Sequence, residues 1–518
     1  MPTRPTAPRR SVPPGSPPLD RRSAPWLAAL LCAAACGGAS TGSGAPGGTP
    51  GAFVPRTAAA VRDLGLVPFD VNRRDLVGPG DWDPQYGKLP EIVVSPGAAG
   101  FDVALQSYDD PARARTFILR FTHAGAGPVL TAAFEAPTLG LLLGFTAAPD
   151  GGFYYATATE DASVDPRYPP PGQHRADVVR VYRADRSGAV VFDVDLDLAR
   201  ARFDGDAEPL INPGVASSAR LALAGGQLAL VHGINTTYDD GVKARHQKAI
   251  STSLDATTGA VSRTSGIWVS HSFDQRYLVE GTDLYEVHLG DAYPRQVIAS
   301  RVRGGAAGSG FPLFHVKGTL GANNTFTRLG DLARTDATTG NGGFLLLLAT
   351  ERAVTDAALV NGSRDLALVR TSPDFASGAP GGAIDAGFGV PFAVTSSGAA
   401  RTNRLQWLTD YAGAGNTQHA ERPKLVALGD GQFLVLWERW TGAARGAQSF
   451  DGTYAMRIDG AGTVLAAATR VTASHLPRGD DAFLSRGEAC FVTGEAAAGT
   501  LTLRCVSPAL TTTETVLR

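Results

Sequence analysis

A glycine-containing turn followed by an apolar strand recurs along the chain. The copy "GDGQFLVLWE", Gly429 to Glu438, places a tight polar turn before a run of aliphatic and aromatic residues. Similar segments are "AGFDVALQS", "GGFYYATAT", "GGQLALVHG", "GTDLYEVHL", "GGFLLLLAT" and "GEACFVTGE", which makes seven copies in all. Runs that are apolar on both faces are typical of strands buried between two neighbouring layers. The pattern predicts an all-β chain.

A second pair of strands follows most copies and encloses a Gly-rich turn, as in "VVRVYRADRSGAVVFDVDL" and "AISTSLDATTGAVSRTS". Asp185, Asp255 and Asp459 each lead into a glycine in such a segment, as the chemistry of a tight turn requires. The fullest unit begins at "PKLVALGDGQ" and reads as strand A, tight turn, strand B, long loop, strand C, tight turn and strand D. We therefore expect sheets of four antiparallel strands.

This organisation resembles a seven-bladed β-propeller, in which radial repetition of four-stranded sheets leaves only short edges. The resemblance covers residues 90–518 and is architectural, because no single propeller family matches. The chain has no WD40 dipeptide signature. "SFDGTY" at Ser449 only half resembles a sialidase Asp-box, and "SLDATTGAV" at Ser253 resembles one quinoprotein-type repeat without companions. Six blades, a pair of β-sandwiches or two smaller β-domains are the alternatives.

The first 36 residues are expected to be a targeting segment rather than part of the fold. A basic, Pro-rich stretch precedes "APWLAALLCAAA", an apolar run of 12 residues that is too short to span a bilayer. Small residues directly before Cys36 resemble the bacterial lipobox, although Ala33 stands where that family usually has leucine. The resemblance implies that Cys36 becomes the lipid-modified first residue of the mature chain. Plain secretion with cleavage nearby is the alternative.

Three regions follow from these patterns. Residues 1–36 form a lipoprotein signal peptide, 37–59 a Gly/Ser/Pro-rich linker, and 60–518 the propeller-like domain. No acidic residue follows Cys36 directly, so we expect the exported protein to be lipid-anchored in the bacterial cell envelope, at the outer membrane. Contact with the membrane is expected through this anchor alone. A net charge of −2 without a basic stripe excludes nucleic acid as a partner.

Cys490 and Cys505 are the only cysteines of the predicted mature domain. They flank a segment that reads as strand, short turn, strand. If the loop is Ala496 to Gly499, Glu495 faces Thr500 and Cys490 falls opposite Cys505. Directly opposed residues of an antiparallel pair are about 4.5–5.5 Å apart, close to disulfide reach. We expect a disulfide, with two buried free thiols as the alternative.

One blade carries the densest polar cluster, in "SHSFDQRYLVEGTDLYEVHLGDAYPRQVIAS". With Glu280 to Asp283 as its first turn, Arg276 falls near Val287, Gln275 opposite His288, and His271 near Ala292. The candidate ligand-binding residues, expected where the long loops meet the central channel, are His271, Asp274, Arg276, His288, Asp291, Tyr293 and Arg295. The alternative is structural, because Arg–Asp pairs often join neighbouring propeller strands.

No catalytic motif or metal-ligand spacing such as HExxH, GxSxG or a P-loop occurs, so the sequence assigns no catalytic residue, metal or cofactor. It favours a lipid-anchored envelope propeller that binds a protein, polysaccharide or small ligand on its loop-rich face. The alternative is a hydrolase or lyase that acts on polysaccharide with carboxylates at the channel mouth. A purely structural role in the envelope is a third hypothesis. Two acids facing each other in the channel would favour the enzyme, and a channel filled with apolar side chains the binder.

Overall fold

The computed structural model describes residues 52–57, 90, 92–107, 115–125, 127–138, 140–159, 179–196, 206–208, 218–238, 245–267, 272–290, 296–303, 306–307, 311–316, 327–335, 343–352, 363–372, 384–396, 399–415, 417–442, 448–477, 479–495 and 499–517. All regular elements in these ranges are strands. No helix there is long and apolar enough to cross a membrane.

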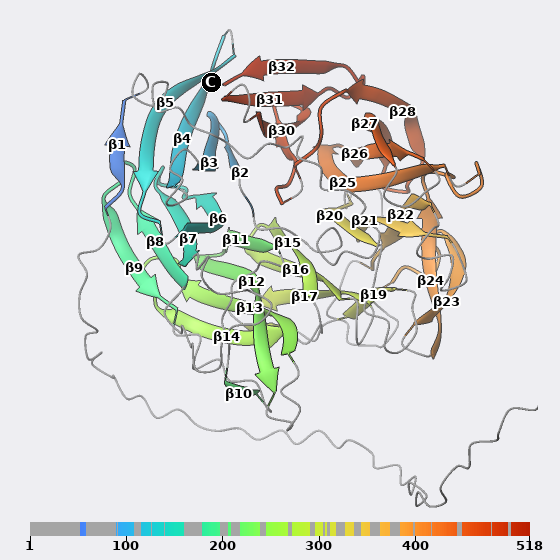
Figure 1. Ribbon diagram of the computed structural model, residues 1–518, viewed down its shortest axis with the longest axis horizontal. Coiled ribbons are helices and arrows are strands. Elements are labelled where there is room, and N and C mark those ends of the chain that lie inside the picture. The colour runs from blue at the N-terminus through green and yellow to red at the C-terminus, as the bar shows by residue number, and fades with distance from the viewer. Residues whose placement is uncertain are drawn as a thin grey trace, which may run out of the picture. The chain divides into compact units, whose positions relative to one another are not determined.

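The strands form seven antiparallel sheets, each with four main strands, and these are the blades of a β-propeller (Figure 1). Blade 1 consists of β2 (Ile92–Gly97), β3 (Gly100–Ser107), β4 (Arg115–Ala124) and β5 (Gly127–Ala136). Blade 2 consists of β6 (Gly140–Ala147), β7 (Phe153–Thr159), β8 (Val179–Ala184) and β9 (Val190–Asp195). Blade 3 consists of β11 (Ala219–Ala224), β12 (Gln227–Tyr238), β13 (Arg245–Asp255) and β14 (Val261–Ile267). The prediction of an all-β propeller is confirmed.

The remaining blades complete the count. Blade 4 consists of β15 (Ser272–Glu280), β16 (Asp283–Gly290), β17 (Gln296–Arg303) and β19 (Phe311–His315). Blade 5 consists of β20 (Arg328–Arg334), β21 (Phe344–Glu351), β22 (Arg364–Arg370) and β24 (Ala399–Trp407). Blade 6 consists of β25 (Gln418–Gly429), β26 (Gln432–Thr441), β27 (Ser449–Asp459) and β28 (Val464–Thr472). Blade 7 consists of β29 (Phe483–Ser485), β30 (Glu488–Glu495), β31 (Thr500–Val506) and β32 (Thr512–Val516).

Four short or peripheral strands extend blades 1, 3, 4 and 5. They are β1 (Val54–Arg56) beside β5, β10 (Asp206–Glu208) beside β12, β18 (Ala306–Ala307) beside β17, and β23 (Val390–Ser396) beside β24. The seven recurring segments of the sequence are the second strands of the seven blades, whose sides face neighbouring blades. Strands such as β21 are buried at every position, as the unbroken apolar runs predict.

The tight turns have the chemistry that the sequence predicts. Asp185 Oδ1 accepts from the backbone N–H groups of Ser187 at 2.8 Å and Ala189 at 3.0 Å. Asp459 Oδ1 does the same for Ala461 and Thr463 at 2.9 and 2.8 Å. Because each turn needs a residue at positive φ, glycine follows in both, with φ of 86° at Gly188 and 79° at Gly462. These turns are short, so the longer connections lie on the opposite, loop-rich face.

Strand β1 corrects the predicted limit of the linker. Val54–Arg56 lie within the range 37–59, yet they pair with β5 in register with Ala133 to Glu135. Phe53 is buried, and its ring lies 5.0 Å from that of Phe153 in blade 2. The apolar side chain and the free edge of blade 1 draw this segment into the folded body, so the linker ends before Phe53.

The ring closes between blade 7 and blade 1, and no blade in the described part of the chain combines strands from its two ends. A buried cluster joins them, in which Phe101 and Phe117 of blade 1 pack with Phe483, Cys490 and Val492 of blade 7. The predicted register is confirmed, because Cys490 is paired with Cys505 and Glu495 with Thr500. The two cysteine sulfurs are bonded at 2.05 Å, so the cross-link lies within the core that closes the ring.

Candidate functional site

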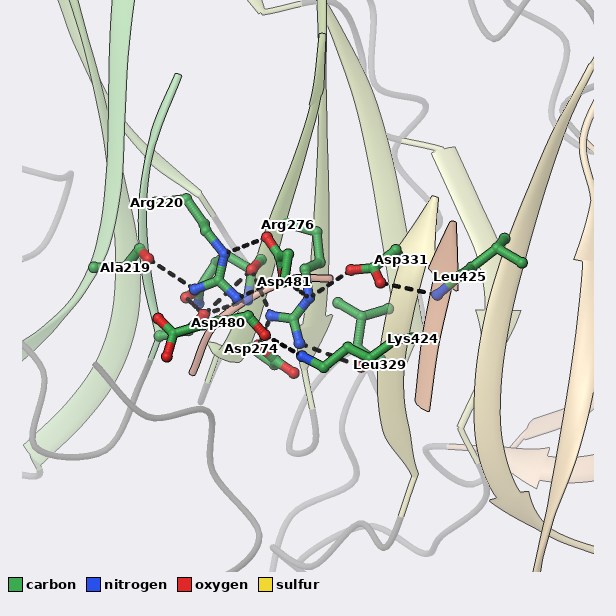
Figure 2. A network of polar contacts seen from close by, with 12 residues as sticks. Ala219, Arg220, Asp274, Arg276, Leu329, Asp331, Lys424, Leu425, Asp480 and Asp481 are labelled. Carbon is green, nitrogen blue, oxygen red and sulfur yellow. Dashed lines mark hydrogen bonds and ion pairs between the residues drawn. The ribbon is translucent and has the colours of Figure 1, made fainter. Parts of the chain in front are cut away.

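The first strands of the blades surround the axis of the propeller and follow one another in a ring: β2, β6, β11, β15, β20, β25, β29 and again β2 (Figure 1). Each of these strands begins at the loop-rich face. Charged side chains from five blades meet beside this ring, as Figure 2 shows. They are Arg220 on β11, Asp274 and Arg276 on β15, Asp331 on β20, Lys424 on β25, and Asp480 and Asp481 immediately before β29. We call this set the channel-mouth cluster.

Asp481 links the most distant blades of the ring. Its Oδ2 and Oδ1 accept from Arg220 Nε and Nη2, both at 3.1 Å, in a bidentate pair. The same Oδ1 lies 3.3 Å from Arg276 Nε. Blades 3 and 4 are the farthest from blade 7 in a ring of seven. The carboxylate therefore bridges the channel rather than joining adjacent blades.

Arg276 is the centre of the cluster. Its Nη1 donates to the Asp274 carboxylate and, at 2.9 Å, to the Gln275 carbonyl, and its Nη2 donates to the Leu329 carbonyl at 3.4 Å. Its Nε lies 3.4 Å from Asp331 Oδ1. Burial disfavours the charged form, but the carboxylates of Asp274, Asp481 and Asp331 raise the pKa of Arg276 above its ordinary value. The guanidinium is thus a permanent buried cation.

Lys424 contacts the main chain of the bridging segment, the stretch that carries Asp480 and Asp481 before β29. Its buried ammonium donates to the Asp480 carbonyl. Burial, and then the positive charge of Arg276, lower the pKa of Lys424 below its usual range. The acceptor is a backbone dipole, so this contact positions the segment without neutralising a carboxylate.

The carboxyl groups of the cluster differ widely in pKa. Burial raises the pKa of Asp480 to about 7, against the pull of Arg220 and Lys424. Burial and the charge of Asp481 raise the pKa of Asp331 to about 6. Asp481 is also penalised by burial, but Arg220, Arg276 and Lys424 together lower its pKa below the ordinary range. At neutral pH Asp481 carries a full charge, while Asp480 is partly protonated.

The segment that carries Asp481 is anchored on blade 6. Glu438 is fully buried, and its Oε1 accepts from Leu476 N–H at 2.8 Å and from Arg422 Nη1 at 3.1 Å. Arg422 also donates to the Leu476 carbonyl at 2.7 Å. Arg422 has a φ of 50° at an irregularity of β25, a conformation that costs a non-glycine residue on the order of 1 kcal/mol. From this position the guanidinium of Arg422 reaches both Glu438 and Leu476.

Of the sequence-predicted residues, the structure brings Asp274 and Arg276 together. The predicted register is confirmed, with Gln275 paired to His288 and Arg276 to Val287. Paired residues point to the same side of a sheet and successive residues to opposite sides. His288 therefore lies on the face opposite Arg276, and the structure does not place it in the cluster. His271, Asp291, Tyr293 and Arg295 lie outside the described residues.

His288 belongs to a separate buried group between blades 3 and 4. Its Nε2 lies 3.4 Å from Glu286 Oε2. Glu286 Oε1 accepts from Ser251 of blade 3 at 2.5 Å and from Tyr277 at 3.1 Å. Burial opposes the charged form of Glu286, but hydrogen bonding and the charge of His288 lower its pKa. This group joins two blades through the contact between Ser251 and Glu286.

No protein-family model matches the chain, and no curated protein does. Among solved structures, the chain is similar to the hemagglutinin-neuraminidase ectodomain of parainfluenza virus 5, at 9% identity and a TM-score of 0.37, over 74% of this chain and 85% of that one. It is also similar to a protein of unknown function from Dyadobacter fermentans DSM 18053, at 10% identity and a TM-score of 0.35, over 72% and 95%. It is also similar to the α-L-arabinanase of Penicillium chrysogenum, at 10% identity and a TM-score of 0.34, over 55% of this chain and 76% of that one. Likenesses this remote carry no argument about activity.

Sequence reasoning missed five members of the cluster: Arg220, Asp331, Lys424, Asp480 and Asp481. Two signals were available in the sequence. "GDD" before a predicted inner strand and a lysine in a chain with few lysines are such signals. The sequence does not show that the side chains of the cluster, which come from five different blades, lie close together. No group of His, Cys, Asp or Glu within the described ranges has the arrangement of a metal site.

Proposed function

We propose that this protein is a binding propeller of the cell envelope that takes a protein, polysaccharide or small ligand on its loop-rich face without chemical conversion. The observation that supports this is the bridge between Asp481 and the two arginines. The charged groups at the channel mouth are already engaged with one another. A site with its ions so paired is suited to rigid presentation of the surrounding loops, where binding residues are usually found.

Two carboxylates of the cluster, Asp331 and Asp481, are bound to an arginine rather than free for hydrolysis of a glycoside. Enzymes that hydrolyse glycosides hold two carboxyl groups about 5–10 Å apart, on either side of the bond to be cleaved. Asp331 and Asp481 instead face the same guanidinium nitrogen, Arg276 Nε, at 3.4 and 3.3 Å. Both acids are therefore engaged by the same guanidinium, which argues against either acting as a free catalytic carboxyl group. The pairing of both acids with Arg276 supports the binding function rather than hydrolysis.

The envelope location is the second part of the proposal and rests on the sequence. The short apolar run and the lipobox-like residues before Cys36 support a lipid anchor. The Gly/Ser/Pro-rich linker gives the propeller reach away from the membrane surface. An anchored platform with variable loops fits a receptor for material outside the membrane.

A polysaccharide hydrolase or lyase is the second candidate, and one observation favours it. Asp480 and Asp481 are adjacent, and their environments drive their pKa values apart, to about 7 for Asp480 and below the ordinary range for Asp481. Neighbouring carboxyls that differ in this way are the pattern of a general acid beside a permanent anion.

One experiment separates the two candidates. Mature wild-type protein and Asp480→Asn are incubated with a panel of neutral and acidic polysaccharides, and both retention in affinity gels and release of reducing or unsaturated ends are measured. We expect retention of one polysaccharide class by both proteins, with no release of ends. Release of ends by the wild type that Asp480→Asn abolishes would establish the hydrolase or lyase instead.

A further inference from the structure

We propose that Arg220 and Arg276 form a carboxylate-binding site, and that Asp481 occupies it as an internal stand-in for the carboxylate of a ligand. This inference rests on the proposed binding function and names the chemistry of the ligand at the channel mouth. It is carried by the geometry of the two arginines and by the way Asp481 reaches them.

The donors are buried, whereas the acceptor is partly exposed. The side chains of Arg220 and Arg276 are 10% and 5% exposed, and that of Asp481 is 36% exposed. Asp481 therefore caps the two guanidinium groups from the accessible side. A carboxylate from outside the chain would approach by the side on which Asp481 now lies.

The arginines do not need Asp481 to hold their positions. Arg220 Nη1 donates to the Ala219 carbonyl at 2.8 Å, which fixes one edge of the guanidinium. Arg276 is held by the Gln275 carbonyl at 2.9 Å and by Asp274. A binding site whose donors are oriented before the ligand arrives loses less entropy on binding.

One donor remains poorly satisfied by the internal carboxylate. Arg276 Nε is buried and has no hydrogen-bond acceptor of suitable geometry among the described residues. Asp481 Oδ1 and Asp331 Oδ1 lie 3.3 and 3.4 Å from it, as ion pairs only. A carboxylate free of the chain can align with this N–H group, which Asp481, tethered to Asp480, does not.

The charges around the site select a monoanion. Asp274 and Asp331 both contact Arg276 and leave little positive charge beyond that needed for one carboxylate. A phosphate dianion would meet these two acids at close range, which costs free energy in a site of low polarity. The planar fork of each guanidinium also matches a planar carboxylate. The ligand group is thus a carboxylate, from a sugar acid or from an amino acid.

The bridging segment can yield without unfolding its blade. Asp481 precedes β29 and follows Gly479, the residue with the fewest conformational restrictions. Leu476 stays attached to Glu438 at 2.8 Å. Among the described residues, displacement of the Asp481 side chain therefore breaks its contacts with Arg220 and Arg276 and leaves the Leu476 anchor in place.

The test uses the full mature protein with Asp481→Ala, which vacates the site. Thermal unfolding is followed in rising sodium acetate, with sodium chloride of equal ionic strength as reference. We expect Asp481→Ala to unfold at a lower temperature than the wild type, and acetate to raise its Tm by about 2 °C or more along a saturable curve. The wild type, whose site is filled, should show no difference between acetate and chloride.

Matched variants identify the donors. Asp385→Ala removes a carboxylate that pairs with a single arginine, Arg370 at 2.6 Å, within one blade, and should show no acetate effect. Adding Arg220→Gln to Asp481→Ala should abolish the effect. If Asp481→Ala does not fold, Asp481→Asn keeps the volume and is measured in the same way. An equal response to acetate and chloride in the folded variant overturns the proposal.

Small probes then separate the sources of the carboxylate. Methyl glucuronide, N-acetylglycine and neutral methyl glucoside are titrated into Asp481→Ala. Stabilisation by the glucuronide alone identifies a sugar acid, and stabilisation by N-acetylglycine alone an amino-acid carboxylate. Stabilisation by the glucoside contradicts a carboxylate site. These measurements do not depend on the natural ligand, so a positive acetate result stands even if the polysaccharide panel fails.

Discussion

Asp481 and Arg220 are 261 residues apart in sequence, and their side chains form a bidentate ion pair across the channel. The pair joins the last blade to the third. Among the described strands, blade 7 and blade 1 share no sheet and meet through packed side chains and a contact of 3.2 Å between Ser485 Oγ and His123 Nε2. The Asp481–Arg220 pair attaches the last blade to the far side of the ring as well. It also fixes what the channel mouth presents to a ligand.

Asp480 should make stability depend on pH. Its folded pKa of about 7 lies above the ordinary value of 3.8, so the folded protein binds a proton that the unfolded chain has released. The stabilisation is complete below about pH 4 and is lost as pH rises toward 7. Asp331, with a pKa of about 6, acts in the same direction. The Asp480→Asn variant should therefore lose less stability than the wild type between pH 4.5 and 7.5, as measured by urea unfolding midpoints. Parallel pH profiles of the two proteins would contradict the assignment.

His288 should be structural. Its side chain is 1% exposed and packs beside Glu286. His288→Ala removes buried contacts, and we expect a loss of about 2–4 kcal/mol in the free energy of unfolding. Val279→Ala, an exposed position on β15, is the control and should change stability by no more than about 0.5 kcal/mol. Both variants should retain the ligand equally. If His288→Ala stays stable but no longer retains the ligand, His288 belongs to the binding site and the structural role is refuted.

The disulfide should stabilise the blade that closes the ring. Linking Cys490 to Cys505 encloses a loop with a sequence separation of 15, worth about 3 kcal/mol in the chain-entropy model. We expect the double variant Cys490→Ala, Cys505→Ala to unfold at lower urea concentration by a corresponding amount. Thiol titration of the unfolded, unreduced mature protein should find neither cysteine free. Detection of both thiols would refute the cross-link in the exported protein.

The anchor prediction concerns Cys36, which lies outside the described residues. Acylation needs the cysteine thiol, and stable anchoring needs more than one acyl chain. Cys36→Ala should therefore move the protein from the membrane fraction to the soluble fraction, as followed by fractionation and mass of the processed chain. A fully processed Cys36→Ala protein that remains in the membrane pellet would refute lipidation at this residue.

The fold was largely predictable because a propeller repeats one local pattern. Segments such as "GGFLLLLAT" mark the second strand of a blade, and counting outward from Glu280–Asp283 placed Gln275 opposite His288. Because side chains alternate between the two faces of a sheet, His288 lies on the face opposite Arg276. The list of candidate residues overlooked this alternation. Contacts between blades depend on how seven similar sheets are ordered in space. The local sequence pattern carries no information on the order of the blades in space. The contact of Asp481 with Arg220 and Arg276 therefore could not be predicted.

A double-mutant cycle on Arg220→Gln and Asp481→Asn tests the central claim, that a charged bridge spans the channel. The free energies of unfolding of the wild type, both single variants and the double variant give the coupling between the two side chains. We predict a coupling of about 1–3 kcal/mol, clearly above that of the matched pair Arg370 and Asp385 within blade 5, which should fall below about 1 kcal/mol. Additive effects of Arg220→Gln and Asp481→Asn would show that the two residues do not act together and would contradict the bridge.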